Sequence, residues 1–537
     1  MNIFKEIFVF KPSAKAEKFE LSGDTKTDFD IREEKEIEKA YVSAEIEKNL
    51  AYIRNRYSVP QNNDVVIREI ITKDSKGAFV LFFEGMVSSQ FVDEYIIKAL
   101  IELPHENEGG FDEDLYMRFT AHAQVKVKTD MDDVADEVNF GSCALFVDGV
   151  AKSFVFDVKM WEHRGIDKPQ NEQSIYGPQE AFAEMLRTNT ALIRKILKTE
   201  KLVAYGIQVG SVSKTPGVLL YIDGLTNKKL VSEAKRRISG IEKDYIISIE
   251  QVQMLVEDRR FMITPQTFAT ERPDRAAKAL SEGRCVFILN GSPRSLIMPG
   301  NAFELTHTAA DEYLQVPFAL MSRLIRLFGM FVSVLLPALY LAITLFHQEI
   351  IPTYLLYSIS ASRENVPFPS LLELLLMDIS FELIREAGIR MPSSIGSTLG
   401  IVGGLILGQA AVSAKIVSPI MIIIIAITGI GSFATADYTL GWTYRILRLG
   451  FIILAASFGF FGIAVGIVIY SLYLGSATSF GVPFLSPSLA MKPHAANLAI
   501  FINGIAKREQ RPGFLKPENH EAEPKISRRW SIKNKFK

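Results

Sequence analysis

Three carboxylates at four-residue spacing are the side chains whose pattern most directly predicts chemistry. Asp378, Glu382 and Glu386 fall on one face of a predicted amphipathic helix in PFPSLLELLLMDISFELIREAGIRMP, because residues four apart are neighbours on a helix surface. If this helix borders a pore, the carboxylates form an acidic vestibule that concentrates cations. The alternative is an interfacial helix whose acids meet Arg385, Arg390 or headgroup water.

A second pattern lies in the apolar segment 391–414. Glycines at strict four-residue spacing give one edge of a helix without side chains: Gly396, Gly400, Gly404 and Gly408. Such an edge lets another helix approach closely, within the chain or between subunits. The opposite line has polar ends and an apolar middle: Thr398, Val402, Leu405 and Gln409. Around an axis of several copies, this line predicts a pore that closes by dewetting. Lipid-facing or core packing of the same residues is the alternative.

Motifs for catalysis are missing from the sequence. It contains no Gly-rich phosphate loop, HExxH, paired CxxC or nucleophile elbow, so we predict no catalytic residue, metal ligand or cofactor. The two cysteines, Cys143 and Cys285, are too few for a disulfide framework and fit a reducing compartment. We therefore expect a protein that is not an enzyme.

The composition of the chain changes at Leu327, and this change indicates the helices that must position these residues. Four stretches after it lack Asp, Glu, Lys and Arg: 327–346, 391–414, 416–436 and 449–474. Each is long enough to cross about 30 Å of hydrocarbon as a helix. We predict that residues 306–490 form an all-α polytopic transmembrane domain with about four spans plus the amphipathic helix.

Basic residues indicate the orientation of these spans. Arg323 and Arg326 directly precede the first span, and the chain beyond residue 504 is rich in Lys and Arg, so both ends satisfy the positive-inside rule. We expect cytoplasmic N- and C-termini and an even number of spans. This topology leaves four arginines on the far side or packed inside the protein: Arg385, Arg390, Arg445 and Arg448. The basic cytoplasmic tail, 491–537, is expected to be disordered from residue 506 and to attract anionic membrane lipid rather than nucleic acid.

The residues before position 306 repeat themselves at a shift of about 140 residues, a sign of duplication. NLAYIR at 49–54 reappears as NTALIR at 189–194, and GSCALFVDG at 141–149 reappears as GRCVFILNG at 283–291. Each copy predicts helices alternating with β-strands. We predict a flexible segment, 1–34, and two similar cytoplasmic α/β domains, 35–170 and 171–305, in which matched residues have packing roles. Plain mixed-sheet modules without a small-molecule site are the simplest interpretation.

Several motifs resemble the A subunits of GerA-type spore germination receptors over about residues 40–500. They are ERPD (Glu271, Arg272, Pro273, Asp274), EGR ending at Arg284, NGSP at 290–293, VPFP at 366–369, REAGIR at 385–390 and GGLILGQAAV at 403–412. Two positions depart from the family pattern. Asn290 stands where Asp is usual, and ATAD at 434–437 stands where a proline usually follows the third span.

The resemblance implies a component of a nutrient-responsive complex in the inner membrane of a dormant spore. It also implies homo-oligomeric rings, expected to be pentamers, that release cations when a permease-like B subunit binds a nutrient and a lipoprotein C subunit assists. We therefore predict a nutrient-gated ion channel subunit. A secondary transporter and a non-conducting scaffold subunit are the alternatives, although the spans show neither inverted repeats nor acids within them.

Overall fold

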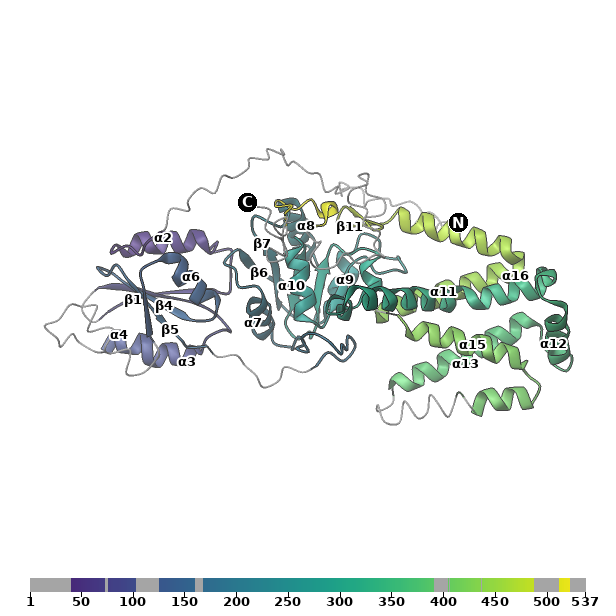
Figure 1. Ribbon diagram of the computed structural model, residues 1–537. Coiled ribbons are helices and arrows are strands. Elements are labelled where there is room, and N and C mark those ends of the chain that lie inside the picture. The colour runs from purple at the N-terminus through teal and green to yellow at the C-terminus, as the bar shows by residue number, and fades with distance from the viewer. Residues whose placement is uncertain are drawn as a thin grey trace, which may run out of the picture.

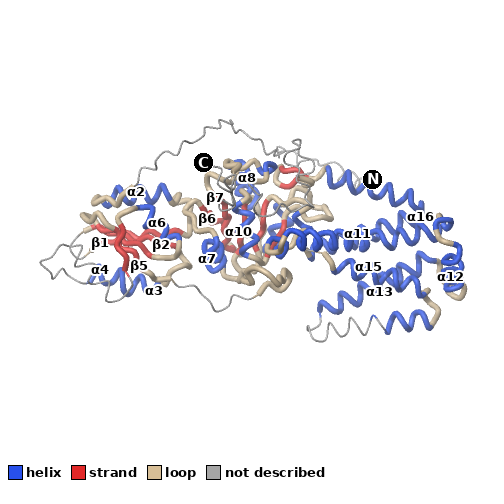
Figure 2. Tube along the Cα trace, viewed as in Figure 1, coloured by secondary structure: helices blue, strands red, loops and turns tan. Residues whose placement is uncertain are grey.

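The computed structural model describes residues 40–72, 76–102, 125–159, 168–390, 404, 406–435, 437–486 and 511–521. The predicted flexible segment 1–34 lies outside these residues. The molecule is elongated, with a first sheet unit (residues 40–159), a second sheet unit (168–301) and a helical region (316–475) in succession (Figure 1). Five-stranded sheets lie in the first two parts, and the third consists of helices (Figure 2).

The first sheet unit is an antiparallel sheet between two layers of helices. Its strands are β1 (Val65–Ile71), β2 (Gly77–Phe83), β3 (Val125–Lys128), β4 (Cys143–Val147) and β5 (Ser153–Phe156), in the order β1-β2-β4-β5-β3. One face is covered by α2 (Ile46–Arg56) and α6 (Met131–Asn139). The other face is covered by α3 (Ser89–Phe91), η1 (Val92–Ile97) and α4 (Lys98–Glu102). All of β4 is buried, which explains its uninterrupted apolar sequence.

The second sheet unit repeats this topology. Its strands are β6 (Leu202–Val209), β7 (Thr215–Ile222), β8 (Phe268–Thr270), β9 (Cys285–Leu289) and β10 (Ser295–Met298), in the order β6-β7-β9-β10-β8. Helices α7 (Leu186–Ile196) and α10 (Pro273–Ser281) cover one face. Helices α8 (Lys228–Ser239) and α9 (Ile249–Val256) cover the other. The predicted α/β character of the soluble part is confirmed, and both copies share one strand order.

Matched residues of the two copies make the same contacts. The Asn49 amide accepts from the backbone N–H of Ser43 at 2.8 Å and donates to its carbonyl at 2.7 Å. Asn189 makes the same two bonds to Ala183, at 2.8 and 2.6 Å. Both asparagines close the turn that enters the first helix of their unit. The packing role predicted for these positions is therefore confirmed.

The family departure at Asn290 leaves its turn intact. In the first unit, Asp148 Oδ1 accepts from the backbone N–H of Ile46 at 3.3 Å, at the start of α2. In the second, Asn290 Oδ1 accepts from the N–H of Leu186 at 3.1 Å, at the start of α7. An amide oxygen satisfies the free N–H of a helix start as a carboxylate oxygen does. The substitution therefore preserves the local geometry.

A buried ion pair fastens the two sheet units to each other. Arg194 of α7 donates through Nε to Asp64 Oδ2 at 2.5 Å and through Nη2 to Asp64 Oδ1 at 2.7 Å. Both side chains are buried, and the guanidinium also lies over the Phe83 ring at 4.0 Å. Two-point pairing of this kind fixes orientation as well as distance. The ion pair therefore fixes how the two sheet units are placed at this contact.

The helical region contains α11 (Val316–Phe346), α12 (Thr353–Arg363), α13 (Ser370–Arg390), α15 (Pro419–Phe433) and α16 (Tyr438–Gly475). Among the described residues, α11 and α16 are long and apolar enough to cross a membrane by length and composition alone, although α16 is interrupted at Gly459. The predicted span 416–436 forms α15, whose 15 residues cover about 22 Å, less than the hydrocarbon core of about 30 Å. Most of the predicted span 391–414 lies outside the described residues. The count of four spans stays a prediction.

Helix α16 reverses direction at Gly459, whose φ of 60° is in the left-handed region. A Cβ placed on Gly466 would lie 2.6 Å from the Phe451 ring, and one on Gly462 would lie 2.1 Å from the Leu454 carbonyl oxygen. Phe451 and Gly466 would be about 22 Å apart in a straight helix. The chain therefore forms a first leg (438–458) and a second leg (460–475) that pack together. The prediction of one continuous span over 449–474 is wrong, because glycines allow the chain to turn back.

Replacing Gly462 with alanine is expected to destabilise this hairpin of legs. The new methyl would overlap the backbone of Leu454, and overpacking of this kind costs about 1–3 kcal/mol. Gly475→Ala is the matched control, since no atom lies within 4 Å of a Cβ at that position. Thermal unfolding of the detergent-purified variants measures the difference. Equal midpoints for the two variants would contradict the close approach of the legs.

Candidate functional site

The residues named by the family motif lie where the second sheet unit meets the helical region. Pro273 opens α10, where its fixed φ suits the first turn and its missing N–H costs nothing. Glu271 and Arg272 directly precede this helix, and Asp274 lies in its first turn. Arg284 precedes β9. The structure thus places the ERPD residues at the N-terminal end of α10 and Arg284 just beyond its C-terminal end.

Glu271 and Arg272 tie the segment before α7 to α10. The Glu271 carboxylate accepts from the backbone N–H groups of Gln170 and Asn171 at 2.9 and 3.1 Å. Arg272 is fully buried and donates to both oxygens of Asp274, at 3.0 and 2.9 Å. Burial alone lowers the pKa of Arg272, but the hydrogen bond and charge of Asp274 outweigh it and raise the pKa. The guanidinium therefore stays charged inside the protein.

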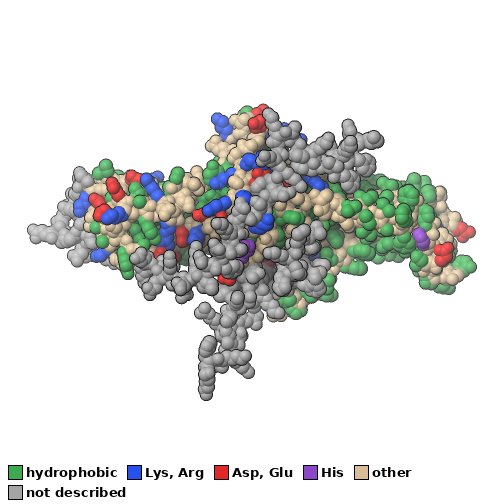
Figure 3. All heavy atoms as spheres, turned by 90° about the horizontal axis from the view of Figure 1, so that it is seen from above, with side chains coloured by type: hydrophobic (Ala, Val, Ile, Leu, Met, Phe, Trp, Pro, Cys, Tyr) green, Lys and Arg blue, Asp and Glu red, His purple; other side chains and the backbone are tan. Residues whose placement is uncertain are grey.

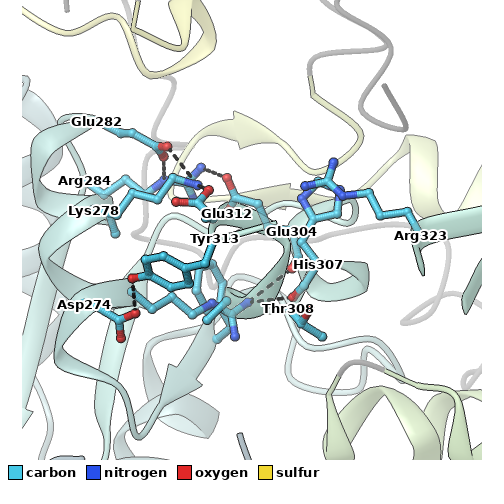
Figure 4. Close-up of a pocket in the computed structure, with 14 residues that line it drawn as sticks. Asp274, Lys278, Glu282, Arg284, Glu304, His307, Thr308, Glu312, Tyr313 and Arg323 are labelled. Atoms are coloured by element: carbon cyan, nitrogen blue, oxygen red, sulfur yellow. Dashed lines mark hydrogen bonds and ion pairs between the residues drawn. The ribbon is translucent and has the colours of Figure 1, made fainter. Parts of the chain in front are cut away.

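Arg284 connects β9 to the segment that leads into α11. Its Nη1 donates to the Pro299 carbonyl at 2.7 Å, and its Nη2 donates to the Glu304 carboxylate. Burial raises the pKa of Glu304, although the Arg284 charge opposes the shift. These side chains line a cavity of about 60 Å³ (Figure 4). That volume holds a few water molecules.

Asp311 and Tyr313 carry the same network to the start of α11. Figure 4 shows Tyr313 pointing at Asp274, and its hydroxyl donates to that carboxylate at 2.5 Å. Asp311 is buried and accepts from Arg323 Nε at 3.2 Å and from Arg326 Nη2. We call these contacts the junction network, consisting of Arg272, Asp274, Arg284, Glu304, Asp311, Tyr313, Arg323 and Arg326.

Sequence analysis missed part of this network. Arg323 and Arg326 were used only to orient the first span, and Asp311 was not singled out. The sequence does contain a signal for Asp311, because Thr308 and Asp311 have the spacing of a capping box. Both hydrogen bonds of that capping box are present in the structure. An acid on that turn faces two arginines of the next helix.

A second cluster of charges lies inside the helical region. Asp378 Oδ1 lies 2.9 Å from Arg448 Nη2, and Glu382 Oε1 lies 2.8 Å from the same nitrogen. Glu382 also pairs with Arg445 at 3.4 Å and with Arg385 at 3.5 Å. Asp378 is 3% exposed and Arg448 1%. This buried ion-pair cluster joins α13 to the first leg of α16.

The sequence left two possible locations for four arginines, the far side of the membrane or the protein interior, and the buried ion-pair cluster distinguishes between them. Arg385, Arg445 and Arg448 pack inside the protein, whereas Arg390 stays exposed and pairs with Glu386 at 2.7 Å. From the sequence, Arg385 and Arg390 were possible partners of the acids, but Arg445 and Arg448 of α16 were not predicted to pair with them. The acidic vestibule itself stays a prediction.

Around Asp378, α13 turns its charged side chain inward and apolar side chains outward. Ile379 is 56% exposed and Leu383 66% exposed, while Asp378, which directly precedes Ile379, is buried. A helix in water shows the opposite arrangement. Figure 3 shows hydrophobic side chains over the helical region and charged ones over the sheet units. Inward-facing paired charges and an apolar outer face are typical of helices in lipid.

The predicted pore-lining residues are mostly outside the described residues. Thr398, Val402 and Leu405 fall there, as do Gly396 and Gly400, and Gln409 is exposed. A Cβ at Gly404 would meet nothing within 4 Å, and one at Gly408 would lie 3.7 Å from Ile422 of α15. The pore lining and the glycine packing edge therefore stay predictions.

The end of the chain returns to the second sheet unit. Residues 511–521 form a strap, with the Glu518 N–H donating to the Leu225 carbonyl at 2.9 Å and Asn227 Nδ2 donating to the Lys516 carbonyl at 3.0 Å. Leu515 is fully buried, and the strap lies beside α8 (Figure 1). The expectation of disorder from residue 506 onward is wrong for these residues, because they add a buried apolar contact and backbone hydrogen bonds.

These features define a class of protein in which a duplicated three-layer α/β region is joined through a network of charges to a helical region with membrane-capable helices. Residues 51–514 match the family model described as Bacillus/Clostridium GerA spore germination protein. The chain belongs to this family, and the resemblance found in its motifs is confirmed.

Relatives match along most of their length. Spore germination protein KA of Bacillus subtilis (strain 168) is 35% identical over 489 residues, which cover 91% of this chain and 90% of that protein. Spore germination protein GerLA of Bacillus cereus is 34% identical and covers 82% and 91%. The crystal structure of the N-terminal domain of the A subunit of the Bacillus megaterium spore germinant receptor GerK3 is 27% identical, with a TM-score of 0.38, and covers 48% of this chain and 96% of that chain.

Proposed function

We propose that this chain is the A-type subunit of a nutrient germinant receptor in the spore inner membrane, and that several copies form a cation-conducting pore. Membership in the GerA family over residues 51–514 is the observation that carries the proposal. A permease-like B subunit and a lipoprotein C subunit are the proposed partners, and no catalytic step is proposed. Several copies in a closed ring, a pentamer in our proposal, would supply the lumen that one chain lacks.

The direction of the chain supports placing both ends in the cytoplasm. Helix α11 starts at the second sheet unit, and the second leg of α16 ends there, with Arg259 Nη1 donating to Ser476 Oγ at 3.0 Å. The reversal at Gly459 provides this return. The sheet units, the start of α11 and the strap would then share the cytoplasmic side.

Two routes connect the sheet units to the helices. The junction network grips the start of α11 through Asp311. The backbone of Ile263 holds both legs of α16, because its N–H donates to the Tyr473 hydroxyl at 2.9 Å and its carbonyl accepts from Thr443 Oγ1 at 2.6 Å. In this mechanism, nutrient binding at the receptor favours one placement of the sheet units. It opens the pore only if the nutrient binds the open arrangement more tightly.

The proposed pore is tested by shortening the side chains that are predicted to close it. Val402→Ala and Leu405→Ala would each reduce the apolar constriction, so spores carrying either variant are expected to germinate without nutrient. The readouts are loss of spore optical density in buffer and single-channel conductance of the purified protein in planar bilayers. Ile423→Ala, on an exposed position of α15, is the control. Unchanged dormancy and conductance in both pore variants would reject this lumen.

Flux separates this proposal from the two alternatives. A channel passes ions without fixed stoichiometry, a secondary transporter saturates with its substrate, and a scaffold passes nothing. Oligomer mass measured on the same preparation completes the test, since a strictly monomeric protein without current would favour the scaffold.

A further inference from the structure

An apolar slot runs along α11 from the junction network into the helical region. Its volume is about 320 Å³, and its walls come from α11 and both legs of α16, with residues 302–307, which connect the second sheet unit to α11, also in the lining. Apolar side chains dominate the lining, among them Met330, Val334, Leu335, Leu447, Phe451 and Ile467. The lining also contains polar groups, among them Arg323 near the start of α11, Thr264, and Tyr444 and Ser471 on the two legs of α16.

The length of the slot fits a single extended chain. From Arg323 to Leu335, its lining covers 12 residue steps of α11, about 18 Å, close to half of a hydrocarbon core about 30 Å thick. Apolar side chains line this length from α11 and both legs of α16, so an acyl chain lying along it would stay in apolar surroundings. The slot is thus about as deep as one membrane leaflet.

The end of the slot near the start of α11 has the charge of a headgroup site. Arg323 lines it, and Arg326 lies one turn further along α11. Both guanidinium groups pair with the carboxylate of Asp311, so two positive charges lie close together there. Basic groups at the cytoplasmic surface attract anionic lipids by about 1 kcal/mol each. A phosphate would reach these arginines while its acyl chain lies among the apolar side chains.

We infer that the slot holds one acyl chain of an anionic phospholipid, with the headgroup phosphate beside Arg323 and Arg326. The inference rests on the membrane placement of the helical region proposed above and not on ion conduction. The lipid would fill space between α11 and the two legs, and its headgroup would touch the network that connects the sheet units to α11. Lipid composition would thereby influence the stability of this connection.

Quenching by brominated lipid tests the site in the purified full-length chain. Phe331→Trp places an indole in the lining of the slot, and Phe331 is half-exposed, so the larger ring is expected to fit. Phe328→Trp, three residues away on an exposed position outside the slot lining, is the matched control. Each variant is reconstituted with unlabelled lipid and increasing fractions of dibromostearoyl phosphatidylglycerol or the matching phosphatidylcholine.

In the Phe331→Trp variant, we expect a low fraction of brominated phosphatidylglycerol to quench most of the fluorescence that the new tryptophan adds. Higher fractions should then cause little further quenching. The Phe328→Trp variant should lose emission only in proportion to the bulk fraction. Adding Val334→Phe, which narrows the slot, should convert the first behaviour into the second. Quenching in proportion to the bulk fraction of brominated lipid in both variants overturns the inference. Absence of quenching by any lipid in the Phe331→Trp variant also overturns it, because a second copy of the chain would then cover the slot. Equal saturation by phosphatidylcholine overturns the headgroup assignment. A Phe328→Trp variant that no lipid quenches would instead reject the membrane placement.

Discussion

Replacing Arg448 with methionine is expected to remove most folded protein from the membrane fraction. Methionine keeps much of the side-chain length but leaves Asp378 and Glu382, whose oxygens lie 2.9 and 2.8 Å from the lost Nη2, without their main partner. Breaking a buried ion pair from one side costs about 3–5 kcal/mol, a large part of the free energy of unfolding of an ordinary domain. Membrane-fraction abundance and thermal unfolding in detergent measure the loss.

Two further variants separate lost pairing from lost packing. Arg390→Met removes an exposed guanidinium whose pair with Glu386 is open to solvent, and exposed pairs contribute little, so this control should behave as the wild type. Asp378→Asn combined with Arg448→Met removes charges of both signs and should recover part of the stability. If Arg448→Met were as stable as Arg390→Met, the buried ion-pair cluster would not hold α13 against α16.

Asp311→Asn is expected to weaken the junction network strongly, and the effect should depend on pH. Burial acts to raise the pKa of Asp311, but the hydrogen bond from Arg326 and the charges of both arginines outweigh it, so the pKa lies below its usual value. The ionised carboxylate therefore stabilises the folded state at neutral pH. This contribution is lost as the pH falls through the folded-state pKa, below the unfolded value of about 3.9.

The measurement compares unfolding free energies of Asp311→Asn and wild type across this pH range. We expect a deficit of about 3–5 kcal/mol near neutral pH, as for other buried pairs, which shrinks in acid. Glu242→Gln, at an exposed position of the second sheet unit, is the control and should show no comparable deficit. Spores carrying Asp311→Asn should also respond poorly to nutrient, because the start of α11 is no longer gripped. A deficit independent of pH would contradict the assigned role of the carboxylate.

The duplicated sheet units could be predicted because the same residues recur in both copies. Cys143 and Cys285 align in the sequence, and both are buried at the first position of equivalent strands, β4 and β9. The strand order could not be predicted in this way. It depends on pairings between distant segments, such as β2 with β4, and local periodicity carries no information about such partners.

The helical region shows where composition misleads. The run 449–474 has no charge, and Gly459 inside it looks like the packing glycines around it, so hydropathy alone predicts one span. Its positive φ is a backbone property that becomes visible only in the fold. For the acids of α13, the sequence offered a pore vestibule or an interfacial helix, with Arg385 and Arg390 as the neighbouring basic groups. Their arginine partners in α16 lie more than fifty residues later, and an ion pair of that separation leaves no periodic trace.

The strap formed by residues 511–521 has a consequence for any attempt to cut or compete with it. Its bonds to Leu225 and Asn227 are intramolecular, so the effective concentration of the strap at this site is set by its covalent connection to the chain, on a scale of about millimolar. A separate peptide of the same sequence would have to approach that concentration to displace it. Cutting the chain before residue 511 would abolish this advantage while leaving the strap's own bonds to Leu225 and Asn227 in place, and the severed fragment would then leave on dilution.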